Sequence, residues 1–299
     1  MPRLVLFLPA SLCFLSRLAA AGDTAWQLHL DRHAAVGDRC SISTTGKQNR
    51  RVETSSPTEP REVSEERIEI IYTAIHEVRA VDGQGRPSEV LLHVDRLCTD
   101  DGSGPQEQFP AGTLITATAD GDQTRYHLGR EELEGSLSDA LNLAGAKLPS
   151  AHEPSEEAVF LNPSPRFPGD RCPADAERLA AAIAATSPFV IDPATSTGEI
   201  RFDQPVTENG IAALATTTTF TVHPVSLRAA SPFQRLTGSS VTSTTVRLFP
   251  IDPALPVLRE TLQTTMKLIQ RATSGPKPAG SETTFRREVT RFCLPLPGK

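Results

Sequence analysis

Two pairs of histidines are the first residues in this sequence whose type and spacing could support chemistry. His29 and His33 are four positions apart, a spacing that places two metal ligands on one face of a helix, but the glutamate of a metalloprotease motif is missing between them. His76 and His93 fall on neighbouring predicted strands, where they would form a pH-sensitive pair or, more often, structural histidines in the core. We interpret all four as structural or surface residues and predict no metal site.

Acidic turns and serine motifs add little further chemistry. The segments 100–104 and 120–122 read Asp-Asp-Gly-Ser-Gly and Asp-Gly-Asp, but they lack the ligand spacing and the distant glutamate of a calcium loop. Turn formation explains both segments. The sequence has neither a Gly-x-Ser-x-Gly elbow nor a phosphate-binding glycine loop, and Ser136 and Ser138 lie in a predicted helix. We therefore predict no catalytic residue and no cofactor, and a hydrolase is the least favoured class.

Four cysteines follow the predicted leader at 1–21, and their sequence contexts match in pairs: Cys40, Cys98, Cys172 and Cys293. They are too far apart for the close pairs that bind zinc, whereas an even number in an exported chain is typical of two disulfides. Gly-Asp-Arg-Cys occurs at 37–40 and again at 169–172, and the other two cysteines each follow an arginine and a large apolar residue. This predicts an internal repeat, with disulfides from Cys40 to Cys98 and from Cys172 to Cys293.

The first residues have the three parts of a cleavable secretory signal peptide. Arg3 gives a positive start, residues 4–15 are mostly apolar, and Ala19 and Ala21 are the small residues before a cut. The apolar run is shorter than the about 20 residues that cross a bilayer, and no later segment approaches such a span. We expect an exported protein, periplasmic or extracellular, with no transmembrane segment in the mature chain.

The elements that must position these residues are mainly strands. Alternating or β-branched runs predict strands at 67–80, 89–97, 113–128 with a turn at 120–122, 210–222, 239–249, 261–271 and 281–294. Leucines at helical spacing predict one helix at 130–148, and an alanine-rich stretch predicts another at 175–185.

These elements predict an α+β fold of duplicated, strand-rich units of antiparallel sheet, each with one packed helix. The units would span 22–158 and 169–299, joined by a proline-rich linker at 159–168. The layout resembles a class of secreted bacterial proteins with two strand-rich halves, each opening with a Gly-Asp motif. In that class the residue after the opening is often Trp, where this chain has Cys40 and Cys172. The class has no established catalytic residues that could be carried over to this chain.

Composition and architecture together lead to two function hypotheses. The net charge of −6 comes from well-mixed acidic and basic residues, which argues against nucleic acid as a partner. We expect a non-catalytic exported protein that binds a lipid or other apolar or amphipathic ligand between sheet and helix. The side chains expected to line that space are Leu133, Leu137, Leu141, Tyr72 and Leu92. The alternative is a structural or protein-interaction module of the cell envelope, whose threonine-rich strands offer a sheet edge to a partner protein.

Overall fold

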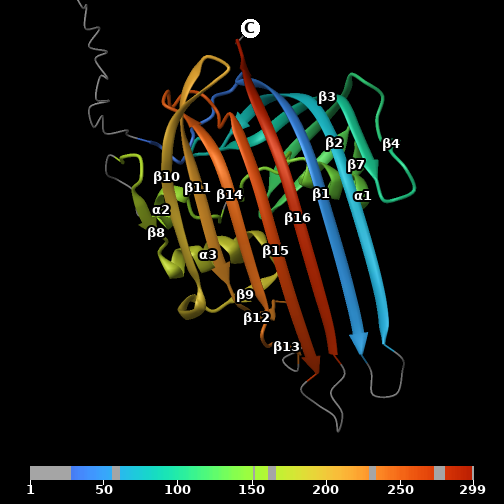
Figure 1. The fold of residues 1–299 in the computed structure, drawn as a ribbon. Helices are drawn as coiled ribbons and strands as arrows, with labels where there is room; N and C mark the ends of the chain where they lie inside the picture. The colour runs from blue at the N-terminus through green and yellow to red at the C-terminus, as the bar shows by residue number, and fades with distance from the viewer. Residues whose placement is uncertain are drawn as a thin grey trace, which may run out of the picture.

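The computed structural model describes residues 28–55, 61–150, 152–160, 166–228, 234–272 and 280–297. The predicted leader at 1–21 and residues 161–165 of the predicted linker lie outside this part of the chain. The described residues form a 14-stranded antiparallel sheet, a two-stranded sheet and a few short helices (Figure 1).

Strands of the first half follow one another from the centre of the large sheet to one edge. They are β1 (Arg39–Ser55), β2 (Glu62–Val81), β3 (Pro87–Asp100), β5 (Thr113–Asp120), β6 (Gln123–Leu128) and β7 (Glu131–Leu133), with β4 (Gln106–Glu107) paired to β3. In β2 the side chains of Ile70, Tyr72 and Ala74 are buried, whereas Ile71 is exposed. This alternation gives the sheet one face toward the core and one toward solvent.

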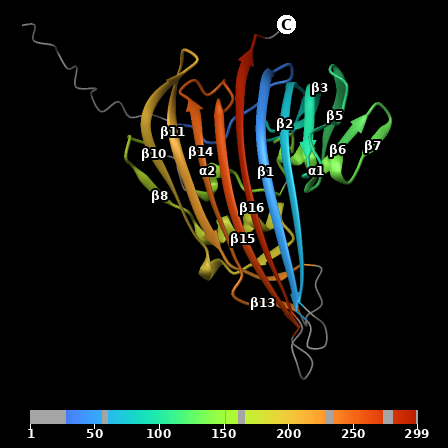
Figure 2. The ribbon, with the colours of Figure 1, turned by 45° about the vertical axis from the view of Figure 1, so that its right-hand side comes forward.

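Strands of the second half continue the same sheet from the opposite edge back to the centre. They are β8 (Arg171–Pro173), β10 (Thr197–Glu208), β11 (Ile211–Val222), β14 (Ser240–Pro250), β15 (Arg259–Ala272) and β16 (Gly280–Leu296), with β13 (Gln234–Leu236) paired to β15. β1 pairs with β16 in an unbroken register from Arg39 opposite Leu296 to Ser55 opposite Gly280. The first and last strands of the sheet therefore meet in its middle (Figure 2).

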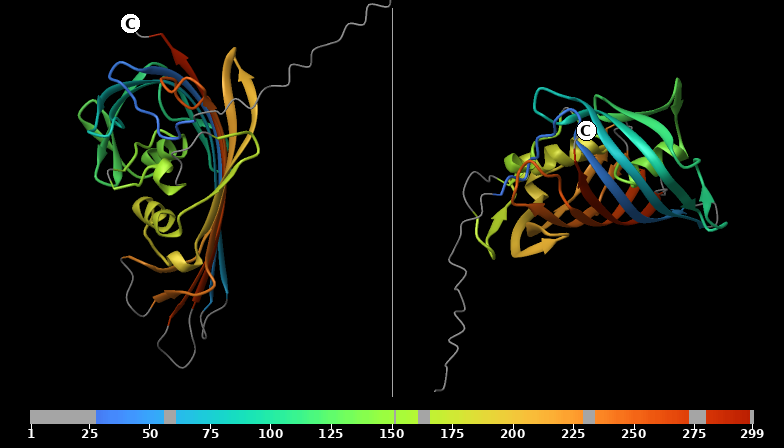
Figure 3. Two further views of the ribbon diagram at one scale, coloured as in Figure 1. Left: turned by 90° about the vertical axis from the view of Figure 1, so that its left-hand side faces the viewer. Right: turned by 90° about the horizontal axis from the view of Figure 1, so that it is seen from above.

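The helices lie on the concave side of this curved sheet (Figure 3). They are α1 (Ser136–Leu143), α2 (Glu156–Val159) and α3 (Ala176–Thr186), near the 3-10 turn η1 (Pro193–Thr195) and the small sheet of β9 (Phe189–Ile191) and β12 (Pro224–Leu227). The side chains of Ser155 and Asp175 accept hydrogen bonds from the first turns of α2 and α3. These caps explain where the two helices begin.

The predicted α+β fold of duplicated units is wrong. About 60% of the structure is strand and only 10% is helix, and both halves of the chain contribute to one continuous sheet. The predicted strands and the helix at 175–185 are confirmed, but the helix at 130–148 is reduced to α1. Residues 131–133 instead pair with β6 as an edge strand, because Leu133 lies opposite the buried Tyr126. The unit boundary at 159–168 stays a prediction.

Two hydrophobic cores fill the concave side. The first packs α1 against β1, β2, β3, β5 and β6, and the second packs α2 and α3 against β8, β10, β11 and β14. The first core contains four large side chains with no exposed surface: Tyr72, Leu92, Ile115 and Leu141. Phe202 is equally buried in the second core. Each core thus covers one half of the same sheet.

The repeated Gly-Asp-Arg-Cys motif builds the same turn twice. Gly37 and Gly169 have φ angles of 94° and 96°, which glycine adopts without strain. The carboxylates of Asp38 and Asp170 each accept a hydrogen bond from the backbone N–H three residues earlier, at 2.7 and 2.9 Å. Each turn leads directly into a strand, β1 or β8. Turn formation is therefore the structural role of both motifs.

Candidate functional site

The five leucine and tyrosine side chains expected to line a ligand space lie in the first hydrophobic core. Tyr72, Leu92 and Leu141 have no exposed surface, Leu133 is 8% exposed, and Leu137 packs against the same cluster. The space between sheet and α1 is thus filled by protein side chains. The hollow space on the concave side lies outside this core.

A pocket of about 490 Å³ opens at the end of the sheet where β1 begins and β16 ends. We call it the strand-end pocket. Its walls come from four parts of the chain: residues 32–42, residues 76–90 of β2 and β3, residues 145–149 after α1, and residues 254–257 with the end of β16. Most of its side chains are apolar, among them Ile42, Val78, Val90, Leu148, Leu255, Val257 and Leu296. The volume lies within the range of small-molecule sites.

Charged side chains in the pocket wall are mostly cationic. Arg32, Arg39, Lys147 and Arg291 line it, against a single carboxylate, Asp38. The Nε group of Arg32 is buried and has no hydrogen-bond partner among the described residues, whereas the Nε of Arg39 lies 3.8 Å from the carboxylate of Glu77. A buried N–H without an acceptor is costly, so an acceptor group placed in the pocket would be stabilised there.

Arg32 also fixes the pocket wall. Its guanidinium donates to the carbonyl oxygens of Pro250 and Asp252 at 2.6 and 2.9 Å and lies over the ring of Phe249. Burial lowers the pKa of Arg32, and the charges of Asp252 and Glu157 oppose this. The contacts connect the chain before β1 to the loop after β14.

His76 places a neutral imidazole in the strand-end pocket. Its Nε2 is 2.9 Å from the hydroxyl of Tyr72, and the two rings meet edge to face. Burial and the charge of Arg291 lower the pKa of His76 to about 3. The imidazole therefore stays uncharged at neutral pH, and the positive charge of the pocket comes from lysine and arginine.

A ladder of charged side chains separates the two cores and ends in the pocket. Arg247, Glu260 and Arg291 lie opposite one another on β14, β15 and β16. Arg247 contacts Glu156 of α2 and lies 2.5 Å from Glu260, which is 3.6 Å from Arg291. Arg291 also donates to the carbonyl of Gly145 in the pocket wall, at 3.1 Å. The ladder therefore connects a helix to the pocket.

The charge of Glu260 is fixed by this ladder. Burial alone would raise the pKa of Glu260, but the charges of Arg247 and Arg291 outweigh it and bring the pKa to about 2. Burial would likewise lower the pKa of Arg247, but Glu156 and Glu260 raise it. Both groups therefore stay ionised across the physiological pH range.

The four cysteines are free thiols, and the fold does not bring together the pairs expected from the repeat. Cys98 on β3 lies opposite the exposed Ile71, on the outer face, while Cys40 faces the pocket on the concave side. Cys172 lies on β8, which is separated by four intervening strands from β16, the strand that carries Cys293. Disulfide bonding requires Cα atoms within about 7 Å, so this fold does not permit either expected bond. Cys40 and Cys293, however, both line the pocket.

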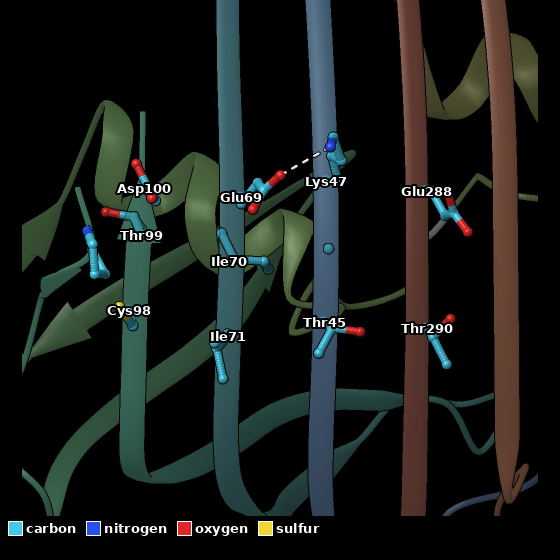
Figure 4. A pocket seen from close by; sticks show the side chains of 12 residues that line it. Thr45, Lys47, Glu69, Ile70, Ile71, Cys98, Thr99, Asp100, Glu288 and Thr290 are labelled. Atoms are coloured by element: carbon cyan, nitrogen blue, oxygen red, sulfur yellow. Dashed lines mark ion pairs between the residues drawn. The ribbon is translucent and has the colours of Figure 1, made fainter. Parts of the chain in front are cut away.

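The opposite face of the sheet carries a shallow outer groove of about 430 Å³ across β1, β2, β3 and β16 (Figure 4). Its lining combines charged and threonine side chains with the exposed Ile71 and the buried Cys98. Lys47 and Glu69 form an ion pair of 3.0 Å, and the hydrogen bonds from Lys47 and Arg67 lower the pKa of Glu69. Such a pair is typical of a solvated sheet surface.

The remaining sequence candidates are distributed over separate places. His29 lies 3.4 Å from Glu157, and His33 bonds the carbonyl of Gln84, so these two histidines have different partners. His93 lies 3.7 Å from Glu77 on the outer face, whereas His76 faces the concave side. The two histidines therefore lie on opposite faces of the sheet and do not form a pH-sensitive pair.

The acidic segments form the predicted turns. The Oδ1 of Asp100 accepts from the backbone of Gly102 and Gly104, and Asp101 accepts from Ser103. Among the described residues, no group of three or more histidine, cysteine or acidic side chains could hold a metal ion. In the same part of the chain, no helix is long and apolar enough to cross a bilayer.

The pocket residues Lys147, Leu255 and Arg291 were not identified from the sequence. They lie in a loop after α1, a loop after β14 and the last strand, and no short motif connects them. Only the meeting of β1 with β16 brings these segments together.

This chain has little similarity in sequence to known proteins. The sequence matches no protein-family model and no curated protein. Two solved structures align over most of the chain at 8% identity. The crystal structure of Pseudomonas aeruginosa OpdQ covers 87% of this chain and 98% of its own, with a TM-score of 0.19. A mutant of the Rh. blastica porin covers 85% of this chain and 100% of its own, with a TM-score of 0.16.

Proposed function

We propose that this protein is a non-catalytic exported binding protein whose strand-end pocket takes an amphipathic ligand with an apolar body and an anionic head. The observation that carries the proposal is the lining of the pocket, which combines apolar side chains from four segments with four cationic groups and one carboxylate. The buried Nε donor of Arg32 and the ammonium of Lys147 would bind the head group, and Leu255 and Val257 would contact the body.

The predicted leader supports export as the setting in which the pocket binds its ligand. The leader at 1–21 predicts a protein outside the cytoplasm, where lipids and fatty acids need a protein surface to cross water. An apolar wall removes the chain of such a ligand from water, and each buried CH2 contributes about 0.8 kcal/mol.

An interaction module of the envelope is less well supported. That alternative depends on threonine-rich strands that offer an edge, but β11 pairs with β10 and β14, and β14 pairs with β11 and β15. The terminal strands β7 and β8 contain three residues each, and β8 covers only Glu199, Ile200 and Arg201 of β10. Short edge strands are a common protection against pairing with another chain.

A fluorescence titration with cis-parinaric acid, a long-chain fatty acid, tests the proposal. Leu255→Asp places a carboxylate in the apolar wall and should weaken binding by ~10- to 100-fold, from the lost apolar contact. Leu294→Asp is the matched control, because Leu294 is 46% exposed and does not line the pocket. Circular dichroism checks that both variants fold.

The same titration distinguishes the contribution of the ligand's anionic head group to binding from that of its hydrocarbon chain. Lys147→Glu should weaken binding of the acid by ~10-fold but leave binding of its uncharged methyl ester unchanged. Lys267→Glu is the control, since Lys267 is exposed on β15 and pairs with Glu282 outside the pocket. If wild-type protein binds neither the acid nor the ester, the proposed function is wrong.

A further inference from the structure

Cys40 and Cys293 face the same side of the sheet on its two central strands. In the β1–β16 register, Cys40 lies opposite Pro295 and Cys293 lies opposite Ile42, so the two cysteines are diagonal neighbours. Both line the strand-end pocket, and each thiol is near enough to shift the pKa of the other. Diagonal neighbours on one face of an antiparallel pair are close enough for their side chains to interact.

We propose that Cys40 and Cys293 form a disulfide that joins the first strand of the sheet to its last. The two residues are free thiols in the structure. Because the register makes them diagonal neighbours on one face of adjacent strands, side-chain rotation with a small strand adjustment would bring the sulfurs to bonding distance. The bond would connect residues 253 positions apart and would lock the only pairing between the two halves of the large sheet.

The surroundings of the pair favour Cys40 as the attacking thiolate. The hydrogen bond from Cys293 is the largest influence on Cys40 and lowers its pKa, and the charge of Arg291 acts in the same direction, against burial and Asp38. The same hydrogen bond and burial raise the pKa of Cys293. Cys40 is also the more accessible of the two, since Cys293 is only 7% exposed.

Bond formation requires a disulfide donor, either a small-molecule disulfide or a disulfide-donating protein of an oxidising compartment. The Cys40 thiolate attacks one donor sulfur, forms a mixed disulfide and releases the other donor sulfur as a thiolate. Cys293 then loses its proton and attacks the sulfur of Cys40, which releases the second donor thiolate. The pair loses two protons and two electrons, and the donor is reduced to two thiols.

The other two cysteines stay outside this exchange. Cys98 is on the outer face beside Arg96, and Cys172 is buried in the second hydrophobic core. Each is separated from the pair by intervening strands. They therefore serve as internal controls for Cys40 and Cys293.

Tryptic peptide mapping of the exported full chain under non-reducing conditions tests the bond directly. Trypsin places the four cysteines in four different peptides, at 40–47, 97–125, 172–178 and 292–299. We expect 40–47 linked to 292–299, with the other two cysteines, which are buried in the folded protein, free to react with an alkylating reagent once the protein is unfolded in urea. Reduced protein incubated with oxidised glutathione should regain the same link and lose about 2 Da of mass.

Four cysteine variants make the result decisive. Cys40→Ser and Cys293→Ser should each abolish the link, whereas Cys98→Ser and Cys172→Ser should leave it in place. In wild-type protein, dithiothreitol should lower the melting temperature by several degrees, and it should not do so in Cys40→Ser. A link from 40–47 to either of the other cysteine peptides, or four alkylated cysteines in exported and glutathione-treated protein alike, would overturn the proposal. The fatty-acid titration is a separate readout, so failure of one proposal does not affect the other.

Discussion

At the scale of the residue, Glu260 is the charge on which the buried ladder depends. Its pKa is lowered from an ordinary value of 4.5 to about 2 by the charges of Arg247 and Arg291, which outweigh burial. A lowering of this size corresponds to about 3 kcal/mol of stability at neutral pH. We therefore expect Glu260→Gln to reduce the free energy of unfolding by roughly that amount, because two arginines lose their partner in a buried site.

The pH dependence of this effect has a definite sign. A carboxylate with a lowered pKa stabilises the folded state fully above pH 4.5, and this contribution is lost as the pH falls toward 2. Urea unfolding should show a large difference between wild type and Glu260→Gln at pH 7 and a smaller one at pH 3. Glu69→Gln is the control, since its solvated partners on the outer face predict little change. Equal effects of the two substitutions would contradict the importance of the ladder.

At the scale of the element, Gly46 sets how closely α1 packs on the sheet. A Cβ atom at this position would lie 2.9 Å from Cγ1 of Ile70 and 3.4 Å from Cγ of Leu143 in α1. Valine normally suits a strand better than glycine. Gly46→Val would therefore stabilise the protein if the space beside Gly46 were free. We expect Gly46→Val to destabilise the protein instead, by about 1–3 kcal/mol, because the core is overpacked.

The destabilisation is measured by comparing the thermal unfolding of Gly46→Val with that of Thr45→Val. Thr45 is the neighbouring residue on the outer face, in the shallow groove, where valine has room. Thr45→Val should therefore leave the melting temperature nearly unchanged. A Gly46→Val protein as stable as wild type would mean that α1 does not pack against β1 as described.

The elements were predictable where their signal is local. Alternation in 67–80 and 113–128 indicated β2, β5 and β6, and the alanine-rich stretch with Asp175 as cap indicated α3. The leucines of 130–148 have helical spacing, but Leu133 pairs with Tyr126 at the sheet edge, so the helix is shortened to α1. β1 was missed because half of it is polar on both faces, so that its sequence has no clear alternation.

At the scale of the whole molecule, the two halves of the chain share one sheet. The pairing of β1 with β16 runs along the full length of both strands and joins the two hydrophobic cores through a common backbone. We expect thermal unfolding to occur in one transition, with coincident curves from circular dichroism and tyrosine fluorescence. Two separated transitions would instead support independent units at 22–158 and 169–299.

The strand-end pocket depends on the same long-range pairing, which explains why sequence analysis did not find it. The expected ligand wall of Leu137 and Leu141 became core, because amphipathic spacing shows which helix face is covered but not what covers it. The pocket residues Lys147, Leu255 and Arg291 come together only after the last strand has paired with the first. The repeated Gly-Asp-Arg-Cys motif predicted an internal repeat, whereas in the structure it forms two equivalent turns whose strands lie at the centre and at the edge of one sheet.

Native mass spectrometry with lipid extraction tests the central claim most directly. The protein would be purified under mild conditions from the compartment to which it is exported, as wild type, Leu255→Asp and Leu294→Asp. Our account predicts an added mass on the wild type and on Leu294→Asp that extraction identifies as an amphipathic acid, and its loss or strong reduction in Leu255→Asp. Wild-type protein that carries no ligand and also fails to retain added cis-parinaric acid would contradict the account.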